Sequence, residues 1–449
     1  MGTVTYRHSV NFPLPEVWDW HTRPGAVVRL TPTHSRMKLV EQADNLRDGT
    51  TVFALPGKLI WRADHQPQDY VPNEQFGDLC TTTGLKQLTG WHHLHHFAAE
   101  GNATTVTDTL TTRAPGGLAA HLLAGMFNYR HNQLHADLTH LRHAAQWSAH
   151  RAPRTVAVTG ADGLVGTQLC ALLTTAGHTV IKLSRSARST TGTRRKWDPH
   201  NPAPNLLEGM DSVIHLAGEP IAGRFTDKHI RAVRDSRVEP TRLLAELAAR
   251  TEGIDTFVCS SAVGLYGNSR SEPADETAPT GGGDIAQIVE DWEGATEPAR
   301  AAGLRVSNIR SGLVLAGGSP LLSLLRANVL LGGGRLGPGT QHFAWIGVDD
   351  AADIYHRALV DPKLSGPINA VAPQTVTNAE FTEILADVGG GWPTIPIPAA
   401  APALVFGQRG AQELALADQN VVPAALQAME HPFRHPDLAS ALRHELCKE

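Results

Sequence analysis

The stretch TVAVTGADGLVGTQLCALLTTAGHTVIKLSR, residues 155–185, decides the fold of this chain. It opens with a short apolar run that suits a buried parallel strand. A glycine pattern follows, and then leucines at the spacing of one helix face: Leu164, Leu169, Leu172 and Leu173. Gly177 ends this helix, and residues 178–183 form a second apolar run. Strand, turn, helix and strand within about thirty residues predict a βαβ unit.

The glycines of this turn, spaced G-x-x-G-x-x-G, predict a dinucleotide site. Such glycines serve a tight turn, a close approach of backbone to pyrophosphate, and close packing of helix on strand. The helix start offers N–H groups and the positive end of its dipole to phosphates. We expect cofactor contacts from five residues here: Gly160, Gly163, Leu164, Val165 and Gly166. The alternative is an ordinary glycine turn of an α/β protein.

The end of the second strand bears on the choice of cofactor. An NAD-preferring site has Asp or Glu here, which accepts a hydrogen bond from the ribose 2′-OH. This chain has Ser184 and Arg185 instead. A guanidinium suits a 2′-phosphate, whereas a carboxylate would repel one. The pattern therefore favours NADP, the alternative being that Arg185 is a surface residue that points to solvent.

Composition excludes several classes of protein. The 449 residues are enough for about two or three domains. The net charge of −5 offers no basic surface to nucleic acid. We find neither a secretory leader nor a run of about eighteen apolar residues that could span a bilayer. The four cysteines lack metal-site spacing, and we expect a cytoplasmic protein that acts on a small molecule.

Residues 1–145 are predicted to form a separate module, joined to the rest by a polar linker at 146–154. We expect strands at residues 4–10, 37–41, 51–54, 59–63, 88–97 and 104–112, and helices at 14–21 and 114–146. This order, with the helix segment FNYRHNQLHADL, resembles the helix-grip fold of the START-like (SRPBCC) superfamily. The resemblance implies an α+β domain with an apolar cavity for a lipid-like, aromatic or polyketide-like ligand.

The segment WHHLHHF at residues 91–97 raises the question of a metal site, because histidine is a common metal ligand. On a strand, His93 and His95 share one face and His92 and His96 share the other. Four neighbouring histidines therefore cannot converge on one ion. We predict no metal site and favour polar sheet positions or a cavity lining for these residues.

Later segments continue the α/β pattern and narrow it to a family. Buried runs at residues 211–216 and 256–261 end in the turns HLAG and SSAVGLYG, and residues 231–249 between them are predicted to form one helix. With the glycine turn, they resemble the extended short-chain dehydrogenase/reductases, a class that includes nucleotide-sugar epimerases. The segments GEPIAG, RDSRVEPT, RSGLVL, FAWIGVDD and GPINAVAPQTVTNAEF are similar to one epimerase-like subfamily, the nucleoside-diphosphate-sugar epimerases, sometimes named after the cell-division inhibitor SulA. The resemblance covers residue 155 nearly to the end. It implies a Rossmann-type doubly wound parallel sheet with a small C-terminal α/β lobe at about residues 365–449.

More cofactor contacts follow from this resemblance. Small residues after the fourth strand of the fold let a cofactor pass close to the backbone. We expect contacts from Leu216, Ala217, Gly218, Arg237, Ser260 and Val314. Arg237 stands where the family has an asparagine, and its guanidinium could hold a cofactor phosphate or a substrate anion. As a helix-surface arginine it would contribute little.

The proton relay of the family is missing. Ordinary members use a Tyr-x-x-x-Lys pair, in which the lysine lowers the tyrosine pKa for proton transfer to the substrate oxygen. None of the five tyrosines of this chain has a lysine four residues later. Val289 lies near the tyrosine slot and Glu293 near the lysine slot. Ser261 fits the family's serine, which orients the substrate oxygen.

Three interpretations of the site remain open. In the first, Ser261 and Tyr266 are catalytic, with Glu290 or Asp291 as proton carriers unless these two form a solvated helix face. In the second, the protein binds NADP(H) without turnover, as a sensor or a hydrophobic-ligand-binding protein. In the third, the N-terminal cavity delivers its ligand to the nicotinamide of a fused reductase. We place an NADP(H)-dependent epimerase or reductase of unknown carbonyl or nucleotide-sugar substrate first.

Overall fold

A computed structural model describes residues 2–35, 37–148, 152–187, 192–269 and 272–448 of the chain. The residues fall into two compact units. The first comprises residues 1–143 with 174–177 and 444–449, and the second comprises residues 144–173 and 178–443. Across the described ranges, no helix combines the length and the apolar character needed to cross a bilayer.

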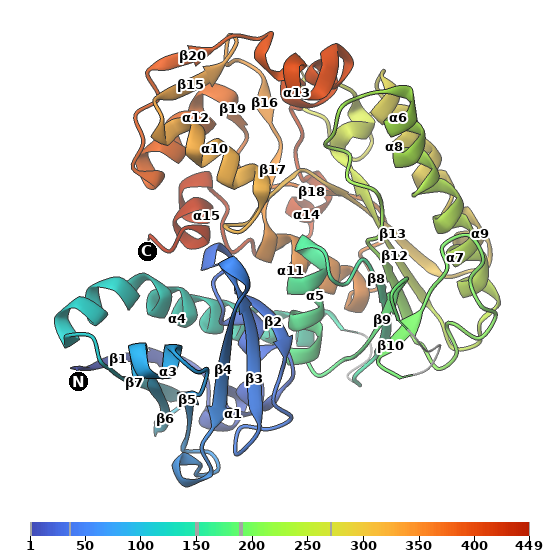
Figure 1. Ribbon diagram of the computed structural model, residues 1–449. Coiled ribbons are helices and arrows are strands. Elements are labelled where there is room, and N and C mark those ends of the chain that lie inside the picture. The colour runs from blue at the N-terminus through green and yellow to red at the C-terminus, as the bar shows by residue number, and fades with distance from the viewer. Residues whose placement is uncertain (1, 36, 149–151, 188–191, 270–271, 449) are drawn as a thin grey trace. The chain divides into compact units, whose positions relative to one another are not determined.

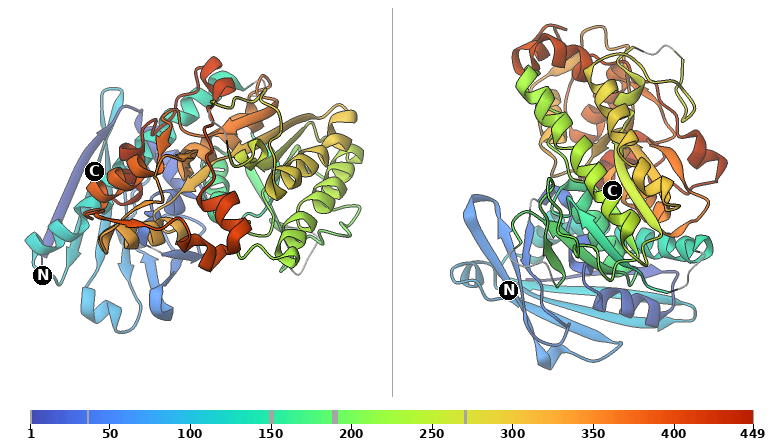
Figure 2. Two further views of the ribbon diagram at one scale, coloured as in Figure 1. Left: turned by 90° about the horizontal axis from the view of Figure 1, so that it is seen from above. Right: turned by 90° about the vertical axis from the view of Figure 1, so that its right-hand side faces the viewer.

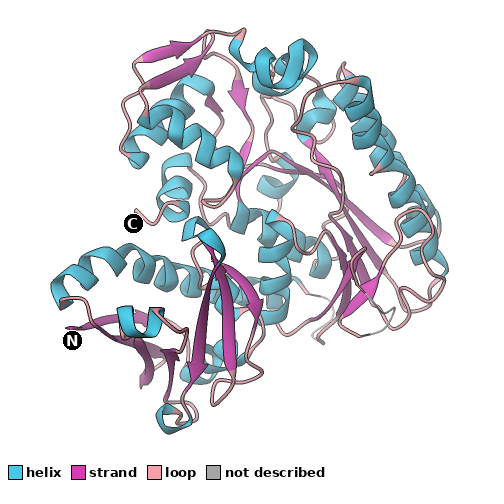
Figure 3. Cartoon of the chain, viewed as in Figure 1, coloured by secondary structure: helices cyan, strands magenta, loops and turns pink. Residues whose placement is uncertain are grey.

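The first unit is built on a seven-stranded antiparallel sheet with the order β1-β7-β6-β5-β4-β3-β2 (Figure 1). Its strands are β1 (Gly2–Val10), β2 (Lys38–Glu41), β3 (Thr50–Leu55), β4 (Leu59–His65), β5 (Gln75–Cys80), β6 (His92–Glu100) and β7 (Ala103–Thr112). The long helix α4 (Gly116–Trp147) runs along one face of this sheet (Figure 3). There the rings of Tyr6 and Phe127 stack 4.1 Å apart. Three short helices, α1 (Leu14–Thr22), α2 (Ala26–Arg29) and α3 (Leu85–Thr89), complete the unit.

Alternation along β6 confirms the expected division of its histidines. His93, His95 and Phe97 are buried, whereas His92 and His96 are partly exposed on the other face. Two expectations for this unit are wrong. Residues 88–91 do not continue the strand, because the helix α3 ends at Thr89 and β6 begins at His92. The strand β5 was missed, because Gly77 and Asp78 interrupt its apolar pattern.

The second unit is built on a seven-stranded parallel sheet with the order β10-β9-β8-β11-β12-β13-β18, which is the doubly wound arrangement. The strands are β8 (Thr155–Thr159), β9 (Thr179–Ser184), β10 (Arg194–Lys196), β11 (Ser212–His215), β12 (Thr256–Ala262), β13 (Arg305–Ser311) and β18 (Gly366–Ala370). The strand order reverses between β8 and β11. In such sheets, ligands bind beyond the carboxyl ends of the strands at this point.

Helices cover both faces of the parallel sheet. The helices α5 (Leu164–Thr175) and α11 (Val348–Val360) lie on one face (Figure 1). On the other face, α6 (Asp227–Asp235), α7 (Val238–Arg250), α8 (Asp284–Gly294) and α9 (Glu297–Ala301) stand in front of the strands in the right-hand view of Figure 2. Leu169, Leu172 and Leu173 of α5 are fully buried, as their spacing predicts.

Shorter elements follow the parallel strands. They are β14 (Leu313–Leu315), α10 (Pro320–Leu330), β15 (Gly333–Leu336), β16 (His342–Phe343), β17 (Trp345–Gly347), β19 (Val376–Thr377), α12 (Asn378–Gly389), β20 (Ile395–Ile397), α13 (Ala401–Gly410), α14 (Ala424–Ala428) and α15 (Leu438–Glu445). Three two-stranded pairings join them: β14 with β17, β15 with β20, and β16 with β19.

Candidate functional site

The glycine turn between β8 and α5 is shaped by two residues that tolerate no side chain. Gly160 has φ +66°, and a Cβ there would lie 2.8 Å from the carbonyl carbon of Leu216. A Cβ at Gly166 would lie 2.2 Å from the carbonyl oxygen of Gly160, so the helix could not pack so closely on the turn. Gly163 differs, because its Cβ would meet one neighbour, the Gly160 oxygen, at 3.2 Å. Space at Gly163 is therefore left toward the outside of the turn.

The first turn of α5 directs backbone N–H groups toward this space. Among the described residues, no acceptor takes the N–H groups of Leu164, Val165 or Gly166. Leu164 was expected on the packed face of the helix, but it is 42% exposed. Its position at the helix start, beside the turn, explains the exposure. These free N–H groups fit the phosphates of a dinucleotide.

A polar brace that the sequence analysis missed holds the turn to the neighbouring strand. The Thr159 hydroxyl accepts hydrogen bonds from the N–H groups of Leu216 and Ala217 and lies 2.7 Å from His215 Nδ1. Burial lowers the pKa of His215 to about 3, so the ring is neutral and its Nδ1 accepts the Thr159 proton. The brace fixes the HLAG turn beside Gly160. Polar residues at the ends of two buried strands were its signal in the sequence.

Ser184 and Arg185 lie at the carboxyl end of β9, beside the glycine turn. The Ser184 hydroxyl accepts from the N–H of Ser186, and Arg185 is exposed. The sequence did not predict that a second arginine lies in this region. Arg194 of β10 forms two hydrogen bonds, of 2.8 and 2.9 Å, with Asp162 of the glycine turn. Residues 188–191 lie outside the described residues.

Arg237 is a buried cation beside the HLAG turn. The expected continuous helix over residues 231–249 is instead two helices, and Arg237 stands at their junction. Its side chain covers Gly218, where a Cβ would lie 2.9 Å from the guanidinium carbon. The guanidinium donates to the carbonyl oxygens of Glu219 and Val233 and lies 4.9 Å from the ring centroid of Trp292.

The charge of this guanidinium is not neutralised. Within the described residues Arg237 forms no salt bridge, although the charge of Glu219 acts on it, and its buried Nε has no hydrogen-bond partner. Burial lowers the pKa of Arg237 to about 10, which leaves it charged at neutral pH. The alternative of a helix-surface arginine is wrong, because Arg237 is 7% exposed. A buried cation without a counter-ion favours an anionic ligand.

Ser261 lies at the end of β12, and its partner is a carboxylate. Its hydroxyl donates to Glu293 Oε1 at 2.5 Å. Glu293 comes from α8 and is held by Arg310 of β13 through two hydrogen bonds of 2.8 Å. Ser261, Glu293 and Arg310 therefore form one hydrogen-bonded network. Val289, near the tyrosine slot, is buried in an apolar cluster.

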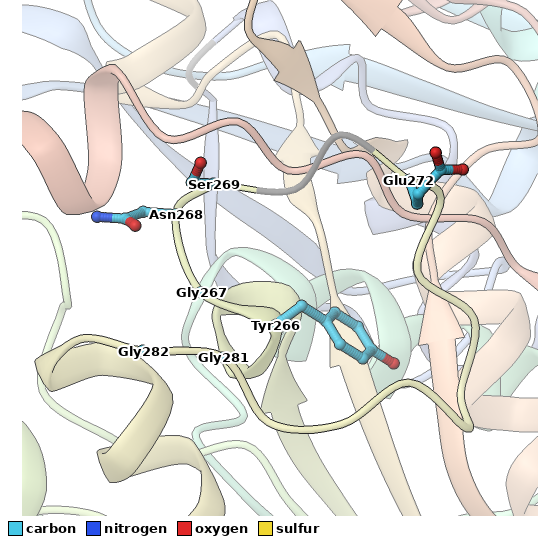
Figure 4. A pocket seen from close by; sticks show the side chains of 7 residues that line it. All are labelled: Tyr266, Gly267, Asn268, Ser269, Glu272, Gly281 and Gly282. Atoms are coloured by element: carbon cyan, nitrogen blue, oxygen red, sulfur yellow. The ribbon is translucent and has the colours of Figure 1, made fainter.

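Tyr266 is tied into the same network. Its hydroxyl donates to Asn369 Oδ1 at 2.7 Å and accepts from Arg310 at 2.8 Å. Burial raises its pKa. The ring borders a cavity of about 480 Å³ whose other lining includes Asn268, Ser269 and Glu272. In Figure 4 the Tyr266 side chain extends from the loop in the direction opposite to Asn268.

The remaining expected residues are dispersed. Ser260 is partly buried in β12, and Val314 lies in β14. Glu290 accepts from Thr280 and Gln287, and Asp291 pairs with Arg234. The last two carboxylates therefore belong to a polar helix face, which was the structural alternative. The missed groups are Arg310 and Asn369, which the sequence places 17 to 103 residues from their partners.

Comparisons with known proteins agree with this geometry. The model of the NAD dependent epimerase/dehydratase family matches residues 156–371, and that of a domain of unknown function, DUF1731, matches residues 397–445. An epimerase family protein of Mycobacterium bovis is 36% identical over 295 residues, which are 65% of this chain and 97% of that protein.

Two solved structures are similar over large parts of the chain. A nucleoside-diphosphate sugar epimerase from Corynebacterium glutamicum has 44% identity and a TM-score of 0.88, over 99% of this chain and 90% of that one. The human epimerase family protein SDR39U1, solved with NADPH, has 31% identity and a TM-score of 0.60, over 66% of this chain and 99% of that one. This chain belongs to the NAD-dependent epimerase/dehydratase family.

Proposed function

We propose that the second unit binds NADP(H) and uses it on an alcohol or carbonyl group of a small molecule, such as a nucleotide sugar. One observation carries the cofactor choice: β9 ends in Ser184 and Arg185 without an acidic residue to hold a ribose 2′-OH. The human relative, 31% identical, was solved with NADPH. In this proposal the phosphates lie on the free N–H groups of Leu164, Val165 and Gly166.

In this proposal Ser261 and Glu293 transfer the proton of the reaction. When bound, the nicotinamide would accept or return a hydride at the substrate carbon. The Ser261 hydroxyl would hydrogen-bond to the substrate oxygen. As a substrate alcohol gives its proton to Ser261, the Ser261 proton would pass to Glu293, to which it is already hydrogen-bonded, and reduction of a carbonyl would reverse this transfer. Arg310 holds Glu293 in place. Arg237 would attract an anionic part of the cofactor or the substrate.

Replacing Arg185 tests the cofactor choice. Binding is measured by NADPH and NADH fluorescence on titration with the full chain. We expect NADPH to bind at least about tenfold more tightly than NADH, because a 2′-phosphate gains a charge-assisted contact. Arg185→Glu should weaken NADPH binding and leave NADH binding little changed. The matched control is Arg300→Glu, a similarly exposed arginine paired with Glu297. Equal affinity of the wild type for both coenzymes would overturn the NADP assignment.

A second function, a non-catalytic NADP(H) sensor or ligand-binding protein, has one observation in its favour. Tyr266 is buried, and its hydroxyl is hydrogen-bonded to Asn369 and Arg310. Ser261→Ala and Glu293→Gln separate the two functions. Loss of hydride transfer to a substrate, with NADPH binding unchanged, supports the enzyme. NADPH binding without turnover of any ketone, aldehyde or nucleotide sugar supports the sensor.

For the first unit we propose a START-like binding domain in a cytoplasmic protein. An antiparallel sheet with a long helix on one face encloses a cavity of about 420 Å³. Its wall includes Phe53, Trp61, Phe76, Leu123 and Met126, which suit a lipid-like or aromatic ligand. Native mass spectrometry of the purified chain tests this: a bound apolar molecule displaced by Phe53→Trp is expected.

A further inference from the structure

Four polar side chains meet at one place on the inner face of the first unit's sheet. In the antiparallel register, Asp78 of β5 lies opposite His93 of β6, and His95 of β6 lies opposite Asp108 of β7. Residues two apart on a strand share a face, and directly opposed residues share it too. Asp78, His93 and His95 all line the cavity of the first unit. Apolar side chains form much of the remaining wall.

Asp108 fixes how the two imidazole rings use their nitrogens. Its Oδ1 lies 2.9 Å from His93 Nε2 and 2.7 Å from His95 Nδ1. The carboxylate can accept an N–H from each ring, which leaves the other ring nitrogens, His93 Nδ1 and His95 Nε2, to act as metal ligands. The rings lie close together, with centroids 3.9 Å apart.

Asp78 completes the group with an unsatisfied carboxylate. Its side chain is 16% exposed, and within the described residues it accepts no hydrogen bond. Asp78 Oδ2 lies 3.9 Å from His93 Nδ1. When His93 Nε2 donates its proton to Asp108, Nδ1 is the acceptor that faces Asp78 Oδ2. Two facing acceptors at this distance suit a cation between them.

We propose that Asp78, His93 and His95 bind a divalent transition-metal ion, zinc first, at the polar end of this cavity. One ligand atom from each residue lies within 4.8 Å of the others. Zinc bonds of about 2.0–2.2 Å need ligand atoms roughly 3.5 Å apart, so the side chains close by about 1 Å on binding. Imidazole nitrogen and carboxylate oxygen are ligands that zinc prefers.

The surroundings support an ion at this position. Metal-bound histidines donate their other ring N–H to a carboxylate, and Asp108 supplies that acceptor to both rings. Asp78 and Asp108 place two carboxyl groups in a buried site, and a divalent ion there would stabilise their charged forms. Arg130 also lines the cavity. Three protein ligands leave a coordination position toward the cavity, for water or for an oxygen of the cavity's ligand.

The test uses the untagged full chain, freed of metal with a chelator and titrated with Zn²⁺ and with Co²⁺. We expect one Zn²⁺ per chain at micromolar affinity or better. Co²⁺ should give the visible absorption of a four- or five-coordinate ion, which Zn²⁺ abolishes. Both ions should raise the melting temperature, because they bind the folded state.

Variants assign the site to these residues. Asp78→Asn should weaken Zn²⁺ binding by at least tenfold, and because Asp78 accepts no hydrogen bond in the described structure, this variant should fold normally. His95→Gln should abolish the Co²⁺ spectrum, and Asp108→Asn should weaken binding about 10–100-fold through the ring orientation. His92→Gln, on the opposite face of β6, is the matched control and should bind as the wild type does.

Three results would overturn the proposal. One is a wild-type chain that binds Zn²⁺ no more tightly than Asp78→Asn does. Another is equal loss of binding in His92→Gln, which would indicate adventitious binding by surface histidines. The third is a protonated His93 between Asp78 and Asp108, seen by NMR as an imidazolium that persists in excess Zn²⁺. In that case a proton occupies the place assigned to the ion.

Discussion

At the scale of single residues, the Glu293–Arg310 pair is the contact whose loss should be most visible. The side chains are 15% and 8% exposed, and each oxygen of Glu293 accepts from the guanidinium. Glu293→Gln leaves the buried cation of Arg310 uncompensated. We expect the free energy of unfolding to fall by roughly 3 kcal/mol, the usual effect of breaking a buried pair. Urea denaturation of the full chain measures this change.

The matched control is Glu297→Gln, since Glu297 forms an exposed pair with Arg300. Its loss should change the unfolding free energy by less than about 1 kcal/mol. A double variant, Glu293→Gln with Arg310→Met, should recover part of the stability, because it removes the unpaired charge. If Glu293→Gln and Glu297→Gln have equal effects, the buried pair is not the determinant of this region's stability.

The residues of the site divide into those that local sequence could predict and those it could not. Gly160 and Gly166 were predicted from their spacing, and their Cβ clashes explain why no other residue fits. Ser261 was predicted from its place at a strand end. Glu293 was recognised in the lysine slot, but its partners were not, because hydrogen bonds between separate strands and helices leave no local pattern. Asp78 was missed for the same reason.

At the scale of elements, two glycines in the turn before α5 should respond differently to substitution by alanine. Gly166→Ala places a methyl group against the Gly160 carbonyl oxygen, with an overlap that backbone must relieve. We expect a loss of stability of about 2–3 kcal/mol from this overpacking, and loss of NADPH binding. Gly163→Ala meets a single neighbour at 3.2 Å and should fold nearly as the wild type does. Thermal melting and NADPH fluorescence measure the two effects separately.

The two variants check each other. Under the proposed function, Gly163→Ala should weaken NADPH binding with little change in melting temperature, because its methyl group projects toward the pyrophosphate. If Gly163→Ala binds NADPH as tightly as the wild type, the phosphates do not lie on this turn. Equal melting temperatures of Gly166→Ala and the wild type would show that the turn relaxes more easily than its geometry indicates.

Element prediction succeeded where periodicity was strong. The strand β8, the helix α5 and the long helix α4 follow from apolar spacing, and each begins within about two residues of its expected position. The expected single helix over 231–249 is broken at Arg237, whose side chain turns inward to cover Gly218. A contact between distant residues determines that break. The strand β5 exists because β4 and β6 supply its hydrogen-bonding partners on both sides.

At the scale of the whole molecule, buried histidines should make the protein sensitive to acid. Burial lowers the pKa of His8 and His21 in the first unit to about 4, and that of His215 in the second unit to about 3. These histidines are neutral in the folded chain, but in the unfolded chain they protonate near the ordinary histidine pKa of 6.5. Below pH 6.5 the unfolded state therefore binds more protons, and stability falls as the pH falls.

The stability from each neutral histidine is fully present above pH 6.5 and is lost progressively down to its folded pKa. The slope approaches about 1.4 kcal/mol per pH unit for each such histidine. Asp350 opposes this trend, because burial raises its pKa to about 7 and the folded state then binds the extra proton between the ordinary aspartate pKa of 3.8 and pH 7. In the second unit, burial also lowers the pKa of His178 to about 4, so two histidines oppose Asp350 there. Both units should therefore unfold more readily at pH 5 than at pH 7.

Denaturant unfolding at pH 5, 6 and 7, followed in each unit by its own tryptophans, measures this dependence. His215→Asn removes one titrating ring from the second unit. The number of protons that this unit takes up on unfolding should fall by up to one, while that of the first unit should not change. The exposed His200 provides the control, since His200→Asn should leave both dependences as in the wild type. A pH dependence of the second unit that is the same in His215→Asn and in the wild type would contradict a neutral ring at the Thr159 brace. It would also remove the physical basis for the rigid HLAG turn on which the proposed cofactor site depends.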